Sequence, residues 1–361
     1  MDHGLRRARL AERLDALELD ALVVARLPNV RYLTGFTGSN GQLIVGRSAS
    51  VLLTDGRYDE QSSREVGDLE RRIYLDERSG HLARALGDLD TRRVGFEREG
   101  FTYGEWERLA GAADGVELVP TASAVEDLRR VKDAEEVALV ARAQAAADAA
   151  FREVVLGGGV REGVTERALA RALELAMRDA GADDKGFDTI AAFGENAAEP
   201  HHEPTERALR RGDVVKLDFG ASAAGYHSDM TRTVSFGEPP ERVREIREVV
   251  AAAQRAGIDA VRPGAPLRSV DRAARAIVEE AGLGDRFPHG LGHGVGLEIH
   301  EVPFLRPDSP EGDVLPEGAI VTIEPGVYIP GIGGVRIEDM VEVTSDGGRV
   351  LAGSPRELLV L

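Results

Sequence analysis

Short apolar runs alternate with helix-like stretches through the first 125 residues of the chain. Leu10, Leu14 and Leu17 recur at helical spacing, which predicts an amphipathic helix within residues 1–20. Farther along, apolar runs and helical patterns follow one another and predict strands and helices in turn. The strands are expected at 21–25, 42–45, 51–54, 72–75 and 94–96, and the helices near 58–66, 79–87 and 102–112. This alternation predicts an α/β domain with a mixed sheet.

The pattern changes near residue 130. A charge-dense segment at 126–136 leads into a long alanine-rich helix at 137–155. No catalytic cluster stands before this change, whereas most of the histidines follow it. The sequence therefore predicts an N-terminal α/β domain at 1–130 and a second, chemically active domain at 131–361.

The second domain contains a weak internal repeat. The segment V-R-E-G at 160–163 is matched by V-R-P-G at 261–264. Each follows a long helical pattern, at 134–156 and 240–260, and each precedes a second helix and then glycine-punctuated strands. This order predicts a duplicated helix-helix-hairpin unit. A duplication of this kind predicts a cleft between the two halves.

Composition and charge limit the chemistry. The 361 residues include 63 Asp and Glu against 45 Lys and Arg, which gives a net charge of 45 − 63 = −18, and no cysteine. Without thiols, any metal must be held by His, Asp and Glu. The acidic charge argues against nucleic acid or an anionic membrane surface as a partner. No apolar run approaches the roughly 18 residues of a membrane span, and the N-terminus lacks a signal peptide's apolar core, so we expect a cytoplasmic protein.

A first pair of carboxylates lies on two neighbouring strands. Alternation through Val215, Leu217 and Phe219 places Asp218 on the opposite face of its strand. A glycine-bearing turn then returns the chain to Asp229. We expect Asp218 and Asp229 to face each other across an antiparallel pair, where opposed side chains lie ~5 Å apart. Two carboxylates so close repel each other unless a cation lies between them.

A second pair repeats this arrangement in the other half. Glu324 ends one β-branched run and Glu338 lies within the next, with glycines between them. Between the two pairs of carboxylates lies H-G-L-G-H-G-V-G at 289–296, whose glycines let the backbone pass close to a ligand. Two Asp, two Glu and one His suit a pair of Mn²⁺-class ions better than a lone tetrahedral zinc. Such ions activate a water and polarise a carbonyl, so the residues predict metal-assisted hydrolysis.

These segments together resemble a known family, the pita-bread metallopeptidases, and within it the Xaa-Pro peptidases, namely aminopeptidase P and prolidase. The motifs that carry the resemblance are Pro200-His201-x-x-Pro204-Thr205, LDFG, SDMTRT, HGLGHGVG, IEPGVY and GGVRIED. The resemblance covers nearly the whole chain. It implies a creatinase-type α/β N-terminal domain followed by an α+β pita-bread catalytic domain with a pseudo-twofold internal repeat.

The resemblance also implies a role for each motif residue. Two divalent metal ions, manganese before cobalt or zinc, would be held by Asp218, Asp229, His293, Glu324 and Glu338. The catalytic residues would be His201, His300 and Glu324, the last of these as a proton shuttle. The substrate-binding residues would be His289, Tyr328 and Arg336. His202 would point away from the site. The partners implied are proline-containing peptides, and the family is commonly homodimeric.

One departure from the family bears on the substrate. Many prolidases have an arginine four residues after the histidine that corresponds to His300, where it binds the dipeptide's terminal carboxylate. This chain has Phe304 at that position, which favours an aminopeptidase P acting on longer peptides, with prolidase as the alternative. The charge could instead come from another arginine. The candidates are Arg306, Arg31, Arg47 and Arg57.

Three other functions remain open. A methionine aminopeptidase is disfavoured by the extra 130-residue domain and by the 14-residue spacing from Glu324 to Glu338. A metal-free, creatinase-like hydrolase is disfavoured because all five metal-binding positions are intact. A non-catalytic binding protein on the same scaffold is disfavoured for the same reason.

Overall fold

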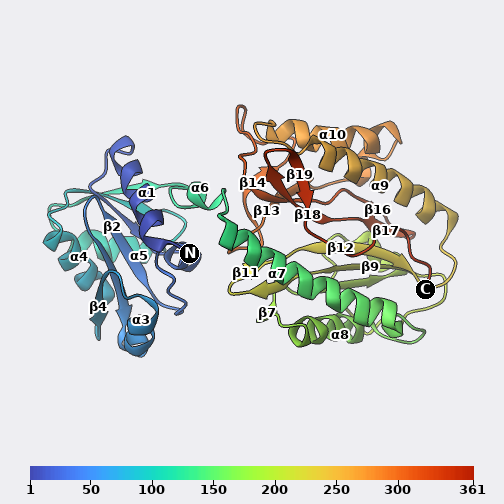
Figure 1. The fold of residues 1–361 in the computed structure, drawn as a ribbon, viewed down its shortest axis with the longest axis horizontal. Coiled ribbons are helices and arrows are strands. Elements are labelled where there is room, and N and C mark those ends of the chain that lie inside the picture. Colours follow the sequence, from blue (N-terminus) through green and yellow to red (C-terminus); the bar gives the residue numbers. More distant parts are fainter. The chain divides into compact units, whose positions relative to one another are not determined.

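In the computed structural model, which describes residues 1–361, the chain divides into two units, Met1–Arg129 and Arg130–Leu361. Each unit has its own sheets and its own hydrophobic core (Figure 1). None of the helices combines the length and the apolar composition that a membrane crossing requires.

The first unit is built on a six-stranded mixed sheet in the order β4-β3-β2-β1-β5-β6. Strand β1 pairs antiparallel with β2 and parallel with β5, as the alternating pattern predicts. The strands are β1 (Ala21–Val24), β2 (Gln42–Gly46), β3 (Ser50–Asp55), β4 (Glu70–Tyr74), β5 (Arg93–Glu97) and β6 (Glu117–Thr121). The helices are α1 (His3–Ala16), α2 (Leu27–Thr34), α3 (Asp59–Glu65), α4 (Arg78–Asp88), α5 (Tyr103–Ala112) and α6 (Glu126–Arg129), with a 3-10 turn at Gly56–Tyr58.

The sequence pattern missed three features of this unit. Leu10 and Leu14 are buried, but Leu17 caps the C-terminus of α1 and is exposed. Helix α2 is only eight residues long, too short for a clear apolar period. Strand β6 lies at the edge of the sheet, where Pro120 is tolerated because one side of the strand needs no partner.

The second unit begins with a helix pair over a three-stranded sheet. The helices are α7 (Ala134–Ala150), continued by a π-helical stretch at Phe151–Gly159, and α8 (Glu166–Asp179). The sheet has the order β12-β9-β8, formed by β8 (Ile190–Phe193), β9 (Val214–Phe219) and β12 (Met230–Ser235). Beside it lie a small sheet of β7 (Asp184–Lys185), β10 (Ala221–Ala223) and β11 (Tyr226–His227), and a 3-10 turn at Gly194–Ala198. Val215, Leu217 and Phe219 enter the core with α7 and α8.

The same plan recurs in the second half of the unit. Helices α9 (Glu241–Ala260) and α10 (Leu267–Glu280) are followed by a 3-10 turn at Gly284–Arg286. The sheet has the order β14-β13-β15-β18-β19, formed by β13 (Gly292–Gly294), β14 (Glu301–Leu305), β15 (Ile320–Ile323), β18 (Asp339–Thr344) and β19 (Gly347–Val350). A hairpin of β16 (Gly326–Ile329) and β17 (Gly333–Arg336) completes it. Figure 1 shows the strands of this unit between the two helix pairs, which is the duplicated α+β architecture that the resemblance implied.

Polar contacts join the two halves along β12 and β17. The Thr233 hydroxyl donates to the Arg336 carbonyl at 2.9 Å and accepts from the Arg336 N–H at 3.2 Å. The backbone N–H of Glu338 donates to the carbonyl of Thr231 at 3.1 Å. These contacts bring the segment that carries Asp218 and Asp229 beside the segment that carries Glu324 and Glu338.

Helix α8 offers a test of the core. Leu173 is fully buried, whereas Leu175 on the same helix is 63% exposed. We expect Leu173→Ala to lower the free energy of unfolding by about 2–5 kcal/mol, because it removes buried methyl groups and leaves a cavity. The matched control Leu175→Ala should change it by less than about 0.5 kcal/mol. Urea denaturation measures both, and equal effects would contradict this assignment of the buried face.

Candidate active site

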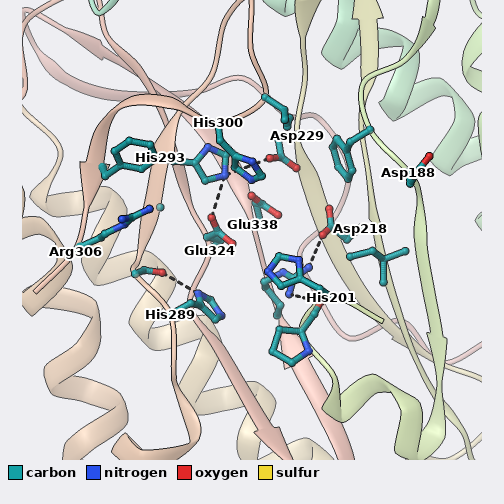
Figure 2. A pocket seen from close by; sticks show the side chains of 18 residues that line it. Asp188, His201, Asp218, Asp229, His289, His293, His300, Arg306, Glu324 and Glu338 are labelled. Atoms are coloured by element: carbon teal, nitrogen blue, oxygen red, sulfur yellow. Dashed lines mark hydrogen bonds and ion pairs between the residues drawn. The ribbon is translucent and has the colours of Figure 1, made fainter. Parts of the chain in front are cut away.

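A cavity of about 560 Å³ lies within the second unit, and nine of the ten site residues expected from the sequence line it (Figure 2). Those nine are His201, Asp218, Asp229, His289, His293, His300, Glu324, Arg336 and Glu338. The tenth, Tyr328, is buried and bonded to His289. Further lining residues that the pattern did not single out include Phe187 and Asp188, which lie in a segment with no distinctive spacing.

A group of metal-binding side chains gathers at the centre of the cavity. Ligand atoms of Asp229, His293 and Glu338 all lie within 4.8 Å of one another, and all three residues are buried. The Nε2 atom of His293 lies 3.6 Å from Asp229 Oδ2 and 3.3 Å from Glu324 Oε1. His293 sits at a bulge in β13, and Glu324 directly follows β15. Residues 109 positions apart (338 − 229 = 109) thus share one site.

The register of β9 and β12 corrects one expectation from the sequence. Asp218 lies opposite Thr231, and Met230 lies opposite Phe219. Asp229 precedes β12 and is therefore a diagonal neighbour of Asp218, so the expected direct pairing of the two carboxylates is wrong. The turn is a tight one, since Ala223 pairs with Tyr226 around Ala224 and Gly225, and the register that it sets places Thr231, two residues after Asp229, opposite Asp218. Both carboxylates still line the cavity.

Burial perturbs the ionisation of the whole group. It raises the pKa of Asp229 and Glu338 well above their ordinary values, and nearby carboxylates add to the shift. Burial also raises the pKa of Glu324 to about 7. It lowers the pKa of His293 to about 3, so this imidazole is neutral and has a lone pair free for a ligand.

These residues fit divalent metal ions. Four carboxylates and one neutral imidazole line the cavity, and only one of the carboxylates, Asp218, is bonded directly to the Arg336 guanidinium. In addition, Asp218 Oδ1 is buried without any hydrogen-bond partner. A buried carboxylate oxygen without a partner is costly, and a cation in the cavity would satisfy it. The donor set of carboxylates and one imidazole suits Mn²⁺-class ions.

Arg336 connects the parts of the site. Its Nη2 donates to Asp218 Oδ2 at 2.5 Å, and its Nε donates to the Thr231 hydroxyl at 2.9 Å. That hydroxyl in turn donates to Glu338 Oε2 at 2.5 Å. The Nη1 atom of Arg336 donates to the Tyr328 hydroxyl at 2.8 Å. The sequence singled out Arg336 but not Thr231, although Thr231 lies in the motif SDMTRT.

The same chain of hydrogen bonds determines which ring nitrogen of His289 carries the proton. The Tyr328 hydroxyl lies 2.9 Å from His289 Nε2, and His289 Nδ1 lies 2.8 Å from the carbonyl of Gly290. A carbonyl only accepts, so Nδ1 carries the proton and Nε2 accepts from Tyr328. Burial lowers the pKa of His289 to about 3, which keeps the ring neutral.

Of His201, His202 and His300, the first and the last line the cavity and His202 does not. His300 lies edge-to-face with His293, with ring centroids 4.4 Å apart, and burial lowers its pKa. His201 is exposed to the cavity (Figure 2). His202 does not line the cavity; it is buried between Glu166 and Glu199. Lys216 is fully buried on the same strand face as Asp218, a placement that the alternation of β9 indicated.

Comparisons with known proteins cover the whole chain. The family model of metallopeptidase family M24 matches residues 138–345, and that of the creatinase/prolidase N-terminal domain matches residues 6–131. The Xaa-Pro dipeptidase of Pyrococcus horikoshii is 36% identical over 353 residues, 97% of each chain. The solved Xaa-Pro dipeptidase from Bacillus anthracis superposes with a TM-score of 0.96 at 38% identity and full coverage of both chains. The solved X-Pro aminopeptidase from Thermotoga maritima gives 0.88 at 33% identity, covering 97% of this chain and 100% of that one.

Metal binding is expected to change how stability depends on pH. The pKa of Glu324 in the folded, metal-free chain, about 7, exceeds its ordinary value of 4.5. Its contribution to stability is therefore fully present below about pH 4.5 and lost as the pH rises through about 7. Mn²⁺ at about 100 times its Kd should restore about 2.7 kcal/mol at pH 8, because it binds only the folded site.

Thermal unfolding at pH 5 and pH 8, with chelator or with Mn²⁺, measures both effects. Glu324→Gln is the control, since the amide keeps the shape but cannot ionise. In this variant, the response to pH and the response to Mn²⁺ should both be reduced. Identical responses in the wild type and the variant would rule out Glu324 as a metal-binding group.

Proposed function

The chain belongs to metallopeptidase family M24, and from this premise we propose that it is an Xaa-Pro dipeptidase, which hydrolyses the bond between a residue and a C-terminal proline. The observation that carries the proposal is the buried group of Asp229, His293 and Glu338 in a cavity lined by histidines. Two relatives at 36% and 38% identity are named Xaa-Pro dipeptidases. They support the dipeptidase, the alternative that the sequence left open, better than an aminopeptidase P.

We assign the metal ligands as the motifs imply. Asp218 would bind one ion, His293 and Glu324 the other, and Asp229 and Glu338 both. When bound, two such ions activate a water and polarise the scissile carbonyl. Arg336 holds Asp218 directly and Glu338 through Thr231, so the protein fixes two of the ligands before any ion arrives.

The other residues bind the substrate and move protons. Glu324, whose Oε1 lies 3.3 Å from His293 Nε2, would take up and release a proton, as the resemblance implies. His201 and His300 face the cavity and can donate to the developing negative charge on the carbonyl oxygen. The neutral ring of His289 lies edge-to-face with Phe287, at 5.0 Å between ring centroids, and offers an apolar wall for proline.

Arg306 supports the dipeptide as substrate. It lines the cavity, and its guanidinium, which makes no hydrogen bond or ion pair within the protein, lies 4.3 Å over the ring of Phe304. Its side chain packs against Gly290, where an added Cβ would lie 2.7 Å from Arg306 Cγ. An unpaired guanidinium at the edge of the site can bind the terminal carboxylate of a dipeptide. Phe304, which in the sequence favours longer peptides, would then support the Arg306 guanidinium with its ring.

A parallel assay tests the proposed substrate. With Mn²⁺, an Xaa-Pro dipeptide should be cleaved with a kcat/KM at least about tenfold above that of the matching Xaa-Pro-Xaa tripeptide, because only the dipeptide places its carboxylate within reach of a cation. Chelation should abolish both activities, and added Mn²⁺ should not restore Asp229→Ala. Preference for the tripeptide would instead indicate an aminopeptidase P.

Arg306→Gln tests the origin of that preference. Loss of one charge-assisted contact should lower kcat/KM on the dipeptide by about 10- to 100-fold, mainly through KM, and should lower it less on the dipeptide's C-terminal amide. Arg349→Gln removes an exposed arginine of β19 outside the cavity and serves as the control. A variant that still favours the free acid over the amide as strongly as the wild type would exclude Arg306 as the carboxylate-binding residue.

A further inference from the structure

Glu166, at the start of α8, is a buried carboxylate that the proposed reaction does not use. Its Oε1 accepts from the Phe193 N–H at 2.8 Å and from the Asn196 side chain at 2.9 Å. Its Oε2 accepts from the Thr205 N–H at 2.9 Å and the Thr205 hydroxyl at 2.6 Å, and lies 2.9 Å from His202 Nε2. A buried charge is costly unless hydrogen bonds satisfy it, and here five contacts do so. One carboxylate therefore ties the end of β8 to the segment 202–205.

His202 is held between two carboxylates. Its Nε2 lies 2.9 Å from Glu166 and its Nδ1 lies 2.9 Å from Glu199, and the ring is buried. Ionised carboxylates accept hydrogen bonds but do not donate them, so both ring nitrogens must donate. The ring therefore bridges the two carboxylates and links Glu166 of α8 to Glu199, which follows the turn Gly194–Ala198.

The neighbouring residue, His201, faces the cavity (Figure 2). Its peptide unit is fixed from the other side as well, because the carbonyl of Pro200 accepts from Lys216 Nζ and from Arg336 Nη1, each at 3.3 Å. Lys216 Nζ also donates to the carbonyl of Glu199. The backbone beside His201 is thus held by Lys216 and Arg336 on one side and by the Glu166–His202 pair on the other.

We propose that Glu166 and His202 are positioning residues, which hold the imidazole of His201 in the cavity and act on the reaction only through it. The inference rests on the proposed function, since it takes His201 to be a catalytic residue. A side chain that is misplaced by about 1 Å can cost a large part of a catalytic effect. The pair would supply the rigidity that an exposed imidazole on a turn lacks.

A second buried carboxylate provides a matched control. Asp148 accepts from the N–H of Gly353 at 2.8 Å and from the N–H and hydroxyl of Ser354 at 2.9 and 2.5 Å. It is buried in the same unit and ties down a chain segment in the same way, but none of these three residues lines the cavity. Asp148→Asn should therefore cost stability without changing kcat.

The experiment is a double-mutant cycle on the Mn²⁺-loaded enzyme with the Xaa-Pro dipeptide, at a temperature where each variant is folded by circular dichroism. We expect His201→Ala to lower kcat on the order of 100-fold, and Glu166→Gln to lower it about tenfold with little change in KM. The kcat of the double variant should match that of His201→Ala within about twofold. Once the His201 imidazole is absent, a change that only misplaces it cannot lower kcat further.

Other outcomes separate the two proposals. If His201→Ala keeps full activity, the proposed role of His201 fails. If His201→Ala loses activity and the double variant loses about 1000-fold, the product of the two single losses, the positioning role is overturned. It is also overturned if Glu166→Gln retains wild-type kcat, or if Asp148→Asn lowers kcat as much. Should Glu166→Gln not fold, His202→Gln takes its place in the cycle, since it leaves the other four contacts of Glu166 intact.

Discussion

The buried guanidinium of Arg336 is the interaction on which the catalytic unit depends. It bonds to Asp218 from one half of the repeat, through Thr231 to Glu338 from the other, and to Tyr328 beside His289. A guanidinium presents its donors in a fixed plane, so the positions of these acceptors are set relative to one another. A lysine could satisfy the charge but not this geometry. The same arginine also reaches the carbonyl of Pro200, next to His201.

Four buried carboxylates gathered in one cavity repel one another unless cations balance them. Burial raises the pKa of Asp229, Glu324 and Glu338, and Asp218 retains an oxygen without a partner. The repulsion and burial of these carboxylates therefore lower the stability of the folded chain. The burial of hydrophobic residues in the two cores of the second unit must offset that cost. Divalent ions would remove that cost. Of the net charge of −18, these four residues account for −4, so part of the chain's acidity belongs to one site.

The proposed preference for dipeptides concerns the residue at position 304. Phe304 stands where many prolidases have an arginine, and by itself this suggested a preference for longer peptides. In the fold, Arg306 lies over the Phe304 ring, held by the gap that Gly290 leaves and by Ser309, whose hydroxyl accepts from the Arg306 N–H. Under the proposed function, this cation two residues along the chain would bind the carboxylate instead of an arginine at position 304. A position-by-position comparison cannot detect such an exchange.

The sequence by itself determined most of the elements, the repeat and the residue types of the site. Local periodicity indicated most of the helices and strands, and the motifs contain the five expected metal-binding residues, because residue type and spacing are local properties. The tertiary structure alone decided the offset between Asp218 and Asp229, the five bonds of Glu166 and the place of Arg306 over Phe304. Each of these depends on the register between strands or on contacts between residues far apart in the chain. Strand register and long-range contacts produce no periodic pattern in the sequence.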